Sequence, residues 1–253
     1  GLDRVKRFLY SSWVEMIREV LITGASSDIG IAICRQYLSN KFRVLGLYNQ
    51  GQPALTRLAR EYPALTLHQL NFESPENTED FIQQEQDRLL ACGIIVHAAA
   101  RVDPVPFFDL KADDLLKAFT VNVIPSLLFT RTLVPAMIDR GWGRIVNLSS
   151  IGVKFGGGSK TFCYSLSKHM LEFFPQDHKS WAANNVLINT VRVGVTDTRI
   201  HKVDMEKDMS QRVSMIPMGR MATPDEIAGV VCWLGSEQNS FITGQVITAA
   251  GGE

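Results

Sequence analysis

The chain has 253 residues, of which 26 are Lys or Arg and 26 are Asp or Glu, so its formal net charge is zero. This balance provides no general electrostatic attraction for nucleic acid or for an anionic membrane. Apolar residues make up 45% of the chain, which is typical of a globular protein with a sizeable core, and no apolar run approaches transmembrane length.

Short apolar runs alternate with longer amphipathic stretches from Met16 to the last residue, and residues 1–15 form a separate N-terminal extension of unknown role. The predicted strands cover 19–23, 43–48, 65–70, 93–98, 144–149, 186–191 and 245–249. Helices are predicted near 29–39, 53–61, 75–91, 111–139, 162–183 and 224–236. This alternation is typical of parallel βαβ units. It predicts one α/β domain over 16–253, doubly wound, with a seven-stranded parallel sheet and helices on both faces.

Residues 199–221 interrupt this alternation, because they are long, polar and rich in Met. A connection of this length in a compact domain is usually a functional flap or a disordered segment. Four methionines would give a flap a soft apolar surface, although packing on the domain explains them equally well: Met205, Met209, Met215 and Met218.

The stretch "TGASSDIG", residues 23–30, joins the first strand to the first helix. Small residues before a helix leave its N-terminal N–H groups and its positive dipole end open to a phosphate. A plain turn also fits, because the strict G-x-G-x-x-G pattern is absent. Asp28 adds a negative charge to this loop, and we predict that its carboxylate turns away from a bound pyrophosphate.

The second strand ends in "LYNQG", residues 47–51, without an acid. A carboxylate there commonly holds the ribose 2′-hydroxyl of NAD and would repel the 2′-phosphate of NADP. Its absence favours NADP(H) over NAD(H), although this stretch has no Arg or Lys for the phosphate either. Ser26, Ser27 and Asn49 offer neutral hydrogen bonds instead.

In "YSLSK", Tyr164 and Lys168 are four residues apart and share one helix face. A neighbouring ammonium is expected to lower the pKa of the phenol, which would let Tyr164 exchange a proton near neutral pH. Ser149 and Ser150 end the fifth strand, at the edge of the sheet where sites of α/β proteins form. Either hydroxyl would be placed to hold a carbonyl oxygen.

These motifs, in this order, resemble the short-chain dehydrogenase/reductase family over nearly the whole chain. "TGASSDIG" is similar to the family's TGxxxGxG loop, with Asp28 in place of a glycine, and "TVNV" carries Asn122 at the position of an active-site asparagine. "NLSS" with "YSLSK" is similar to the family's Ser, Tyr and Lys. "GVTDT" resembles the segment that grips the nicotinamide carboxamide.

The resemblance implies that Tyr164 is the general acid for carbonyl reduction and that Ser150 orients the carbonyl. It implies that Lys168 binds the nicotinamide ribose and that Asn122 holds a water of the proton relay. Ser149 stays an alternative, because Ser150 is one residue further from Tyr164 than the family usually has. The implied cofactor contacts are Gly24, Ser26, Ser27, Asp28, Ile29, Gly30, Asn49, Asn71, Ala98, Ala99, Tyr164, Lys168, Val195, Thr196 and Thr198.

The chain departs from the family pattern at several positions. "HAAA", His97 to Ala100, replaces the family's NNAG, so a sheet contact of the missing Asn must be made another way, and His97 is expected to be structural. Asn71 stands where an Asp usually meets the adenine, and Val193 replaces a proline. Pro175 falls inside the predicted helix after Lys168, where it would kink or break that helix.

The resemblance extends most closely to 3-oxoacyl-[acyl-carrier-protein] reductases, which implies an acyl-thioester substrate, a possible acyl carrier protein partner, and a homodimer or homotetramer. A cytoplasmic location is expected because the N-terminus lacks the apolar core of a signal peptide. An acidic carrier protein needs basic residues at the site entrance, and the candidates are Arg140, Arg144, Lys154 and Lys160. Two alternatives stay open: an oxidoreductase of free alcohols, steroids or sugars, and a nucleotide-binding homologue without turnover. The four cysteines are expected to be small buried side chains in a reducing compartment, and no zinc-ligand spacing is found among the histidines.

Overall fold

A computed structural model describes residues 18–199 and 209–253. Within these residues, seven parallel strands form one sheet in the order β3-β2-β1-β4-β5-β6-β7. The strands are β1 (Glu19–Thr23), β2 (Arg43–Tyr48), β3 (Leu65–Gln69), β4 (Ile94–His97), β5 (Gly143–Ser150), β6 (Val186–Val193) and β7 (Gln245–Ala249). The predicted doubly wound fold with a seven-stranded parallel sheet is confirmed.

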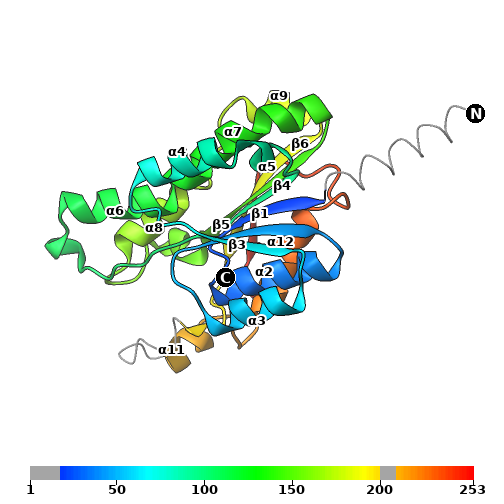
Figure 1. The fold of residues 1–253 in the computed structure, drawn as a ribbon. Helices are drawn as coiled ribbons and strands as arrows, with labels where there is room; N and C mark the ends of the chain where they lie inside the picture. Colours follow the sequence, from blue (N-terminus) through cyan, green and yellow to red (C-terminus); the bar gives the residue numbers. More distant parts are fainter. Residues whose placement is uncertain (1–17, 200–208) are drawn as a thin grey trace, which may run out of the picture.

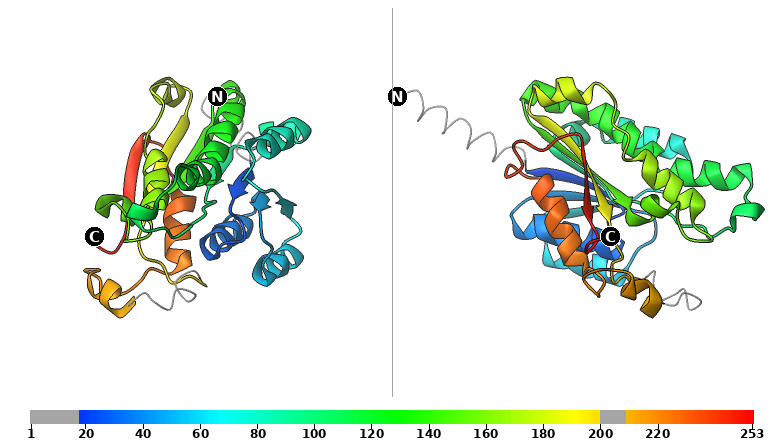
Figure 2. Two further views of the ribbon diagram at one scale, coloured as in Figure 1. Left: turned by 90° about the vertical axis from the view of Figure 1, so that its left-hand side faces the viewer. Right: turned by 180° about the vertical axis from the view of Figure 1, so that it is seen from behind.

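Helices cover both faces of the sheet (Figures 1 and 2). One face carries α2 (Asp28–Ser39), α3 (Pro53–Glu61) and α12 (Pro224–Leu234). The other carries α4 (Pro75–Gln84), α5 (Gln86–Leu90), α6 (Ala112–Asn122), α7 (Ile124–Arg140), α8 (Phe162–Met170) and α9 (His178–Ala182). Two short 3-10 helices, η1 (Phe107–Asp109) and η2 (Ile151–Phe155), follow β4 and β5, and α11 (Met209–Ser214) precedes α12.

The strand order reverses between β1 and β4, which pair with each other although β2 and β3 lie between them in sequence. Loops that leave the carboxyl ends of such neighbouring strands diverge to opposite faces, and the crevice between them is where ligands of open α/β sheets bind. The loops after β1, β4 and β5 meet at this crevice.

Two of the predicted helices are interrupted within their predicted ranges. The predicted helix 111–139 is interrupted at Asn122–Val123, because Pro125 has no N–H to donate to the carbonyl of Val121. The predicted helix 162–183 ends at Met170, and 171–177 form turns around Pro175 before α9 begins. The sequence prediction was wrong for the second half of this helix, although Pro175 had marked the break.

Helices α6 and α7 together form a stretch, Ala112–Arg140, that is long and apolar enough to cross a membrane by length and composition alone. The sequence analysis expected no such stretch. In the fold, Phe129, Leu133 and Met137 of α7 are fully buried against the sheet in a cluster with residues of β1, β4 and β5. The apolar face of this helix therefore packs in the core of the domain.

The second half of the predicted flap packs on the end of the chain. Arg212 forms an ion pair with the buried carboxylate of Glu253 at 2.6 Å, and the Met218 N–H donates to the Gly251 carbonyl at 3.0 Å. Residues 200–208 of the flap and the predicted extension 1–15 lie outside the described residues, so the domain boundaries stay a prediction.

Candidate active site

The loop between β1 and α2 is built from backbone, because side chains would not fit at its glycines. Gly24 has φ +69°, and a Cβ added to it would lie 2.6 Å from the backbone of Ala99. A Cβ on Gly30 would lie 2.1 Å from the Gly24 carbonyl oxygen. Ser27 is the N-cap of α2, since its Oγ accepts the Gly30 N–H at 2.9 Å. The loop therefore presents the N-terminus of α2 to the crevice as a cradle that fits a phosphate.

Asp28 makes a contact that sequence reasoning missed. Its carboxylate accepts the Arg199 backbone N–H at 2.7 Å and pairs with the Arg199 Nε at 2.7 Å. Arg199 also donates from Nη2 to the Ser26 carbonyl at 3.1 Å and from Nη1 to the Gln52 side chain. No local signal identifies this pair, because the two residues are 171 positions apart.

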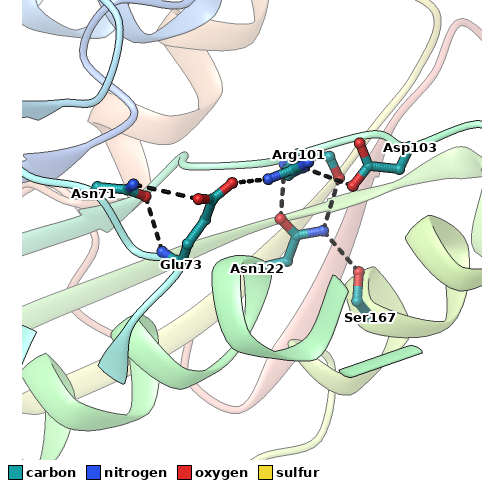
Figure 3. A network of polar contacts seen from close by, with 6 residues as sticks. All are labelled: Asn71, Glu73, Arg101, Asp103, Asn122 and Ser167. Atoms are coloured by element: carbon teal, nitrogen blue, oxygen red, sulfur yellow. Dashed lines mark hydrogen bonds and ion pairs between the residues drawn. The ribbon is translucent and has the colours of Figure 1, made fainter. Parts of the chain in front are cut away.

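The carboxyl ends of β2 and β3 carry two of the predicted cofactor contacts. Asn49 follows β2 and is exposed, with its carbonyl accepting from the Gln69 side chain at 2.8 Å. The Asn71 Oδ1 accepts the Glu73 N–H at 2.9 Å. Asn71 is therefore held in a local turn, with its side chain among the polar groups shown in Figure 3.

Thr23, at the end of β1, holds the "HAAA" segment through two hydrogen bonds. The Thr23 carbonyl accepts the Ala98 N–H at 3.3 Å, and the Thr23 Oγ1 accepts the Ala99 N–H at 3.2 Å. The backbone of Ala98 and Ala99 therefore lies directly against the phosphate loop, at a distance that only a glycine at position 24 allows.

Tyr164, Lys168 and Ser150 come together at the carboxyl end of β5. The buried Lys168 Nζ donates to the Leu148 carbonyl at 2.8 Å and lies 5.9 Å from the centre of the Tyr164 ring. Burial lowers the pKa of Lys168 from 10.5 to about 8. Burial also raises the pKa of Tyr164 above 10.0, and a hydrogen bond with Ser150 opposes this rise. The expected net lowering of the Tyr164 pKa is therefore wrong: burial raises the pKa, and the group that opposes this rise is the Ser150 hydroxyl rather than the Lys168 ammonium.

The two candidate serines point in different directions. The Ser150 hydroxyl lies beside Tyr164 and also accepts the Gly152 N–H at 3.2 Å. Ser149 is buried, and its hydroxyl donates to the Glu172 carboxylate at 2.6 Å. Arg192 of β6 forms an ion pair with the same carboxylate. Of the two hydroxyls, Ser150 is the one grouped with Tyr164.

Asn122 clamps the loop after β4 (Figure 3). Its Oδ1 accepts the Arg101 N–H at 2.7 Å, and its Nδ2 donates to the Arg101 carbonyl at 3.0 Å and to the Ser167 Oγ at 2.9 Å. Ser167 in turn donates to the Tyr164 carbonyl at 2.7 Å. Asn122 therefore joins the crevice loop to the helix of Tyr164, and both of its amide hydrogens are used within the protein. Its predicted role of holding a water is untested.

Arg101 extends this network toward the far end of the crevice. It pairs with Glu73, which follows Asn71, and its Nε lies 2.6 Å from the Asp103 carboxylate. These three charged side chains were absent from the sequence prediction, because nothing in the sequence shows that the loops after β3 and β4 meet.

His97 is structural in its contacts, as the sequence analysis expected. Its Nε2 lies 3.3 Å from the Thr130 Oγ1 of α7. Burial, with a further contribution from Lys168, lowers the pKa of His97 to about 3, so the ring is neutral at physiological pH.

The segment after β6 lies beside the crevice. Ala222 holds it by pairing with Thr196 and by donating its N–H to the Val195 carbonyl at 2.9 Å. Thr196 is buried and donates its Oγ1 to the Gly194 carbonyl at 3.0 Å. Thr198 is half-buried and directly precedes Arg199.

Two of the predicted carrier-protein contacts are wrong. Arg144 is fully buried at the start of β5, where it donates to the carbonyls of Gly143, Asn185 and Asn239. The Arg140 guanidinium donates to the carbonyls of Leu90 and Cys92, also at the amino ends of the strands. Both cations serve the fold, because they bind backbone carbonyls at this edge of the sheet. Lys154 and Lys160 are exposed at the opposite edge, beside the crevice.

The chain matches known proteins over nearly its whole length. A family profile described as Enoyl-(Acyl carrier protein) reductase matches residues 24–253. A 3-oxoacyl-[acyl-carrier-protein] reductase of Aquifex aeolicus is 32% identical over 238 residues, which cover 92% of this chain and 95% of the relative. An acetoacetyl-CoA reductase of Cupriavidus necator is 28% identical over 240 residues, which cover 93% of this chain and 97% of the relative.

This chain belongs to the short-chain dehydrogenase/reductase family. It is therefore an oxidoreductase. A solved structure of a short-chain dehydrogenase/reductase family protein has a TM-score of 0.81 at 25% identity and covers 92% of this chain and 96% of its own. A 3-oxoacyl (acyl-carrier-protein) reductase of Agrobacterium tumefaciens with NADP bound has a TM-score of 0.84 at 24% identity, with 97% of each chain covered, and shows the same fold.

The buried ammonium of this dehydrogenase/reductase site gives a pH-dependent prediction. Because folding lowers the pKa of Lys168 to about 8, the charge destabilises the folded state fully below pH 8, and this cost disappears as pH rises to 10.5, where the unfolded chain also loses the proton. Lys168→Met should raise the free energy of unfolding relative to the wild type at pH 7, by roughly 3 kcal/mol at most, less the lost hydrogen bond to Leu148. Urea unfolding at pH 7 to 10 measures the difference.

The difference between the two proteins should shrink steadily above pH 8. A difference that stays constant across this range would contradict the buried-ammonium account.

Proposed function

We propose that this protein catalyses the NADP(H)-dependent reduction of the keto group of a 3-oxoacyl thioester to a hydroxyl. The observation that carries the proposal is the grouping of Ser150, Tyr164 and Lys168 at the carboxyl end of β5, beside the phosphate loop. The family's ketoreductases, by name 3-oxoacyl and acetoacetyl reductases, support the reaction type.

The reduced nicotinamide, when bound, supplies the hydride. The protein's own task is to hold the ketone and to give its oxygen a proton. The raised pKa of Tyr164 keeps the phenol protonated at neutral pH, as a general acid requires. The Ser150 hydroxyl donates to the carbonyl oxygen and polarises it. The Lys168 ammonium beneath the ring stabilises the phenolate that the proton transfer leaves.

Two observations support NADP(H) as the cofactor. The end of β2 has no carboxylate to repel a 2′-phosphate, and the Agrobacterium structure with the same fold has NADP bound. The glycine cradle at the N-terminus of α2 fits the pyrophosphate of the same molecule.

Exposed aromatic rings at the start of α8, the helix that carries Tyr164, support an apolar acyl substrate. Phe107 of η1 packs edge to face on Phe162, two residues before Tyr164, with 5.1 Å between ring centroids. Phe108 extends this surface and is 98% exposed. The Val105 N–H donates to the Lys160 carbonyl at 2.8 Å, which holds the two loops of this surface together. An acyl chain gains free energy by burying such apolar rings.

Lys154 and Lys160 are the cations that an acidic acyl carrier protein would meet at this edge. We propose carrier-protein docking on these two residues, in place of the four of the sequence prediction.

The function is tested by following NADPH oxidation with acetoacetyl-carrier protein, acetoacetyl-CoA, a ketosteroid and a ketose. We expect turnover with both thioesters, little with the steroid or the sugar, and a kcat/KM at least about tenfold higher for the carrier-bound thioester. A higher kcat/KM for the steroid or the sugar would contradict the proposed thioester substrate. NADPH binding without turnover of any of these ketones would favour a non-catalytic homologue. Equal kcat/KM values for the two thioesters would contradict carrier-protein docking and would leave thioester reduction standing.

The predicted homo-oligomer stays a proposal, as does the cytoplasmic location. Helices α6 to α8 and the turn after them expose large apolar side chains that a second copy would cover: Leu116, Leu127, Leu166, Met170 and Phe173. Light scattering is expected to give the mass of a dimer or tetramer, and a monomer's mass would refute it.

A further inference from the structure

Arg199 brings a positive charge to a corner of the crevice formed by two described segments that contain none. Residues 24–30 of the phosphate loop and 47–53 at the end of β2 contain no Lys or Arg. The two segments adjoin, since the Ala25 N–H donates to the Leu47 carbonyl at 2.9 Å. Arg199 lies across both through the Ser26 carbonyl and the Gln52 side chain. In folds of this type, the ribose 2′ position of a dinucleotide lies at this corner.

The Arg199 guanidinium is bound to an acid at Nε. Its two terminal nitrogens are bound to neutral groups, which an anionic ligand can displace. Nε and the backbone N–H are bound to the Asp28 carboxylate. Nη1 and Nη2 are bound to neutral acceptors, the Gln52 amide oxygen and the Ser26 carbonyl. A phosphate dianion is a stronger acceptor than either amide, and it matches the two terminal nitrogens of an arginine as a bidentate partner.

We propose that Arg199 is the residue that selects NADP(H) over NAD(H), by binding the 2′-phosphate with Nη1 and Nη2 while Asp28 holds Nε. The acid in the phosphate loop then has a purpose: it orients the cation and balances its charge while no phosphate is bound. The side chain of Arg199 is 44% exposed, so the terminal nitrogens are accessible from solvent. This inference depends on NADP(H) as cofactor and is independent of the acyl substrate.

The test compares Arg199→Met with Arg43→Met by titrating NADPH and NADH through nicotinamide fluorescence, without substrate. Arg43 is the matched control: it is also an exposed, ion-paired arginine, bound to Glu19 at 2.8 Å, and it begins β2 at the opposite edge of the sheet. Arg199→Met should weaken NADPH binding by about 10- to 100-fold, the effect of losing hydrogen bonds to a charged group, and should leave NADH binding within about threefold. Arg43→Met should change neither, and Arg199→Lys should recover part of the loss.

A second pair of ligands isolates the 2′-phosphate. Calorimetry with 2′,5′-ADP and with 5′-AMP, which differ only by that phosphate, should show the loss in Arg199→Met for 2′,5′-ADP alone.

Equal weakening of NADPH and NADH would place Arg199 at the pyrophosphate and overturn the proposal. Unchanged binding of NADPH and NADH would show that the Asp28–Arg199 ion pair only connects two loops, and this result would also overturn the proposal. Because binding is measured without a ketone, a protein that selects NADPH through Arg199 and reduces no thioester would leave this inference standing while the proposed substrate fails.

Discussion

The buried hydrogen bond from the Lys168 ammonium to the Leu148 carbonyl holds the site together. It joins helix α8 to the end of β5, so Tyr164, one turn earlier on α8, comes to lie over the carboxyl edge of the sheet. Ser150 is two residues beyond Leu148, where β5 ends and η2 begins, and its hydroxyl lies beside Tyr164. Ser149 points the other way, to Glu172. The lysine contact therefore fixes the helix of Tyr164 against the end of β5.

The short catalytic helix explains why Glu172 is buried. Pro175 ends the helical hydrogen bonding after Met170, and the chain turns inward over the ends of β5 and β6. The Glu172 carboxylate is then satisfied by Ser149 and by two nitrogens of Arg192. Hydrogen bonds and charge from Arg192 lower the pKa of Glu172 although burial opposes this. The ion pair links the turn after α8 to Arg192 of β6.

The fold was predictable from the sequence because each element carries its own periodic pattern. All seven strands lie within a residue or two of their predicted ends, and the order of strands and helices fixes the doubly wound topology. The grouping of Ser150, Tyr164 and Lys168 was also predictable, since a four-residue spacing and a strand end define it locally. Helix breaks at Pro125 and Pro175 were underestimated because the apolar pattern continues through them.

Contacts between loops that are far apart in the sequence could not be predicted from it. Asp28 with Arg199, Glu73 with Arg101, and Thr23 with Ala99 each join residues whose neighbourhood exists only once the sheet has formed. The same limit applies to Arg144. From the sequence, an arginine near the start of a strand is expected to be a surface cation, whereas in the fold its guanidinium donates to five protein oxygens. The direction of the Tyr164 pKa shift was missed for a related reason, because burial cannot be weighed against a nearby charge until both are placed.

The account depends most on the Tyr164 phenol as the proton donor, and a comparison of Tyr164→Phe with Ser149→Ala tests it most directly. Both variants lose one hydroxyl near the end of β5, but the Ser149 hydroxyl is turned to Glu172. The measurement is kcat for acetoacetyl-CoA reduction at saturating NADPH, with NADPH binding checked separately. Tyr164→Phe should lower kcat by at least about 100-fold with NADPH still bound, and Ser149→Ala should keep kcat within about threefold. Near wild-type turnover in Tyr164→Phe would contradict the account.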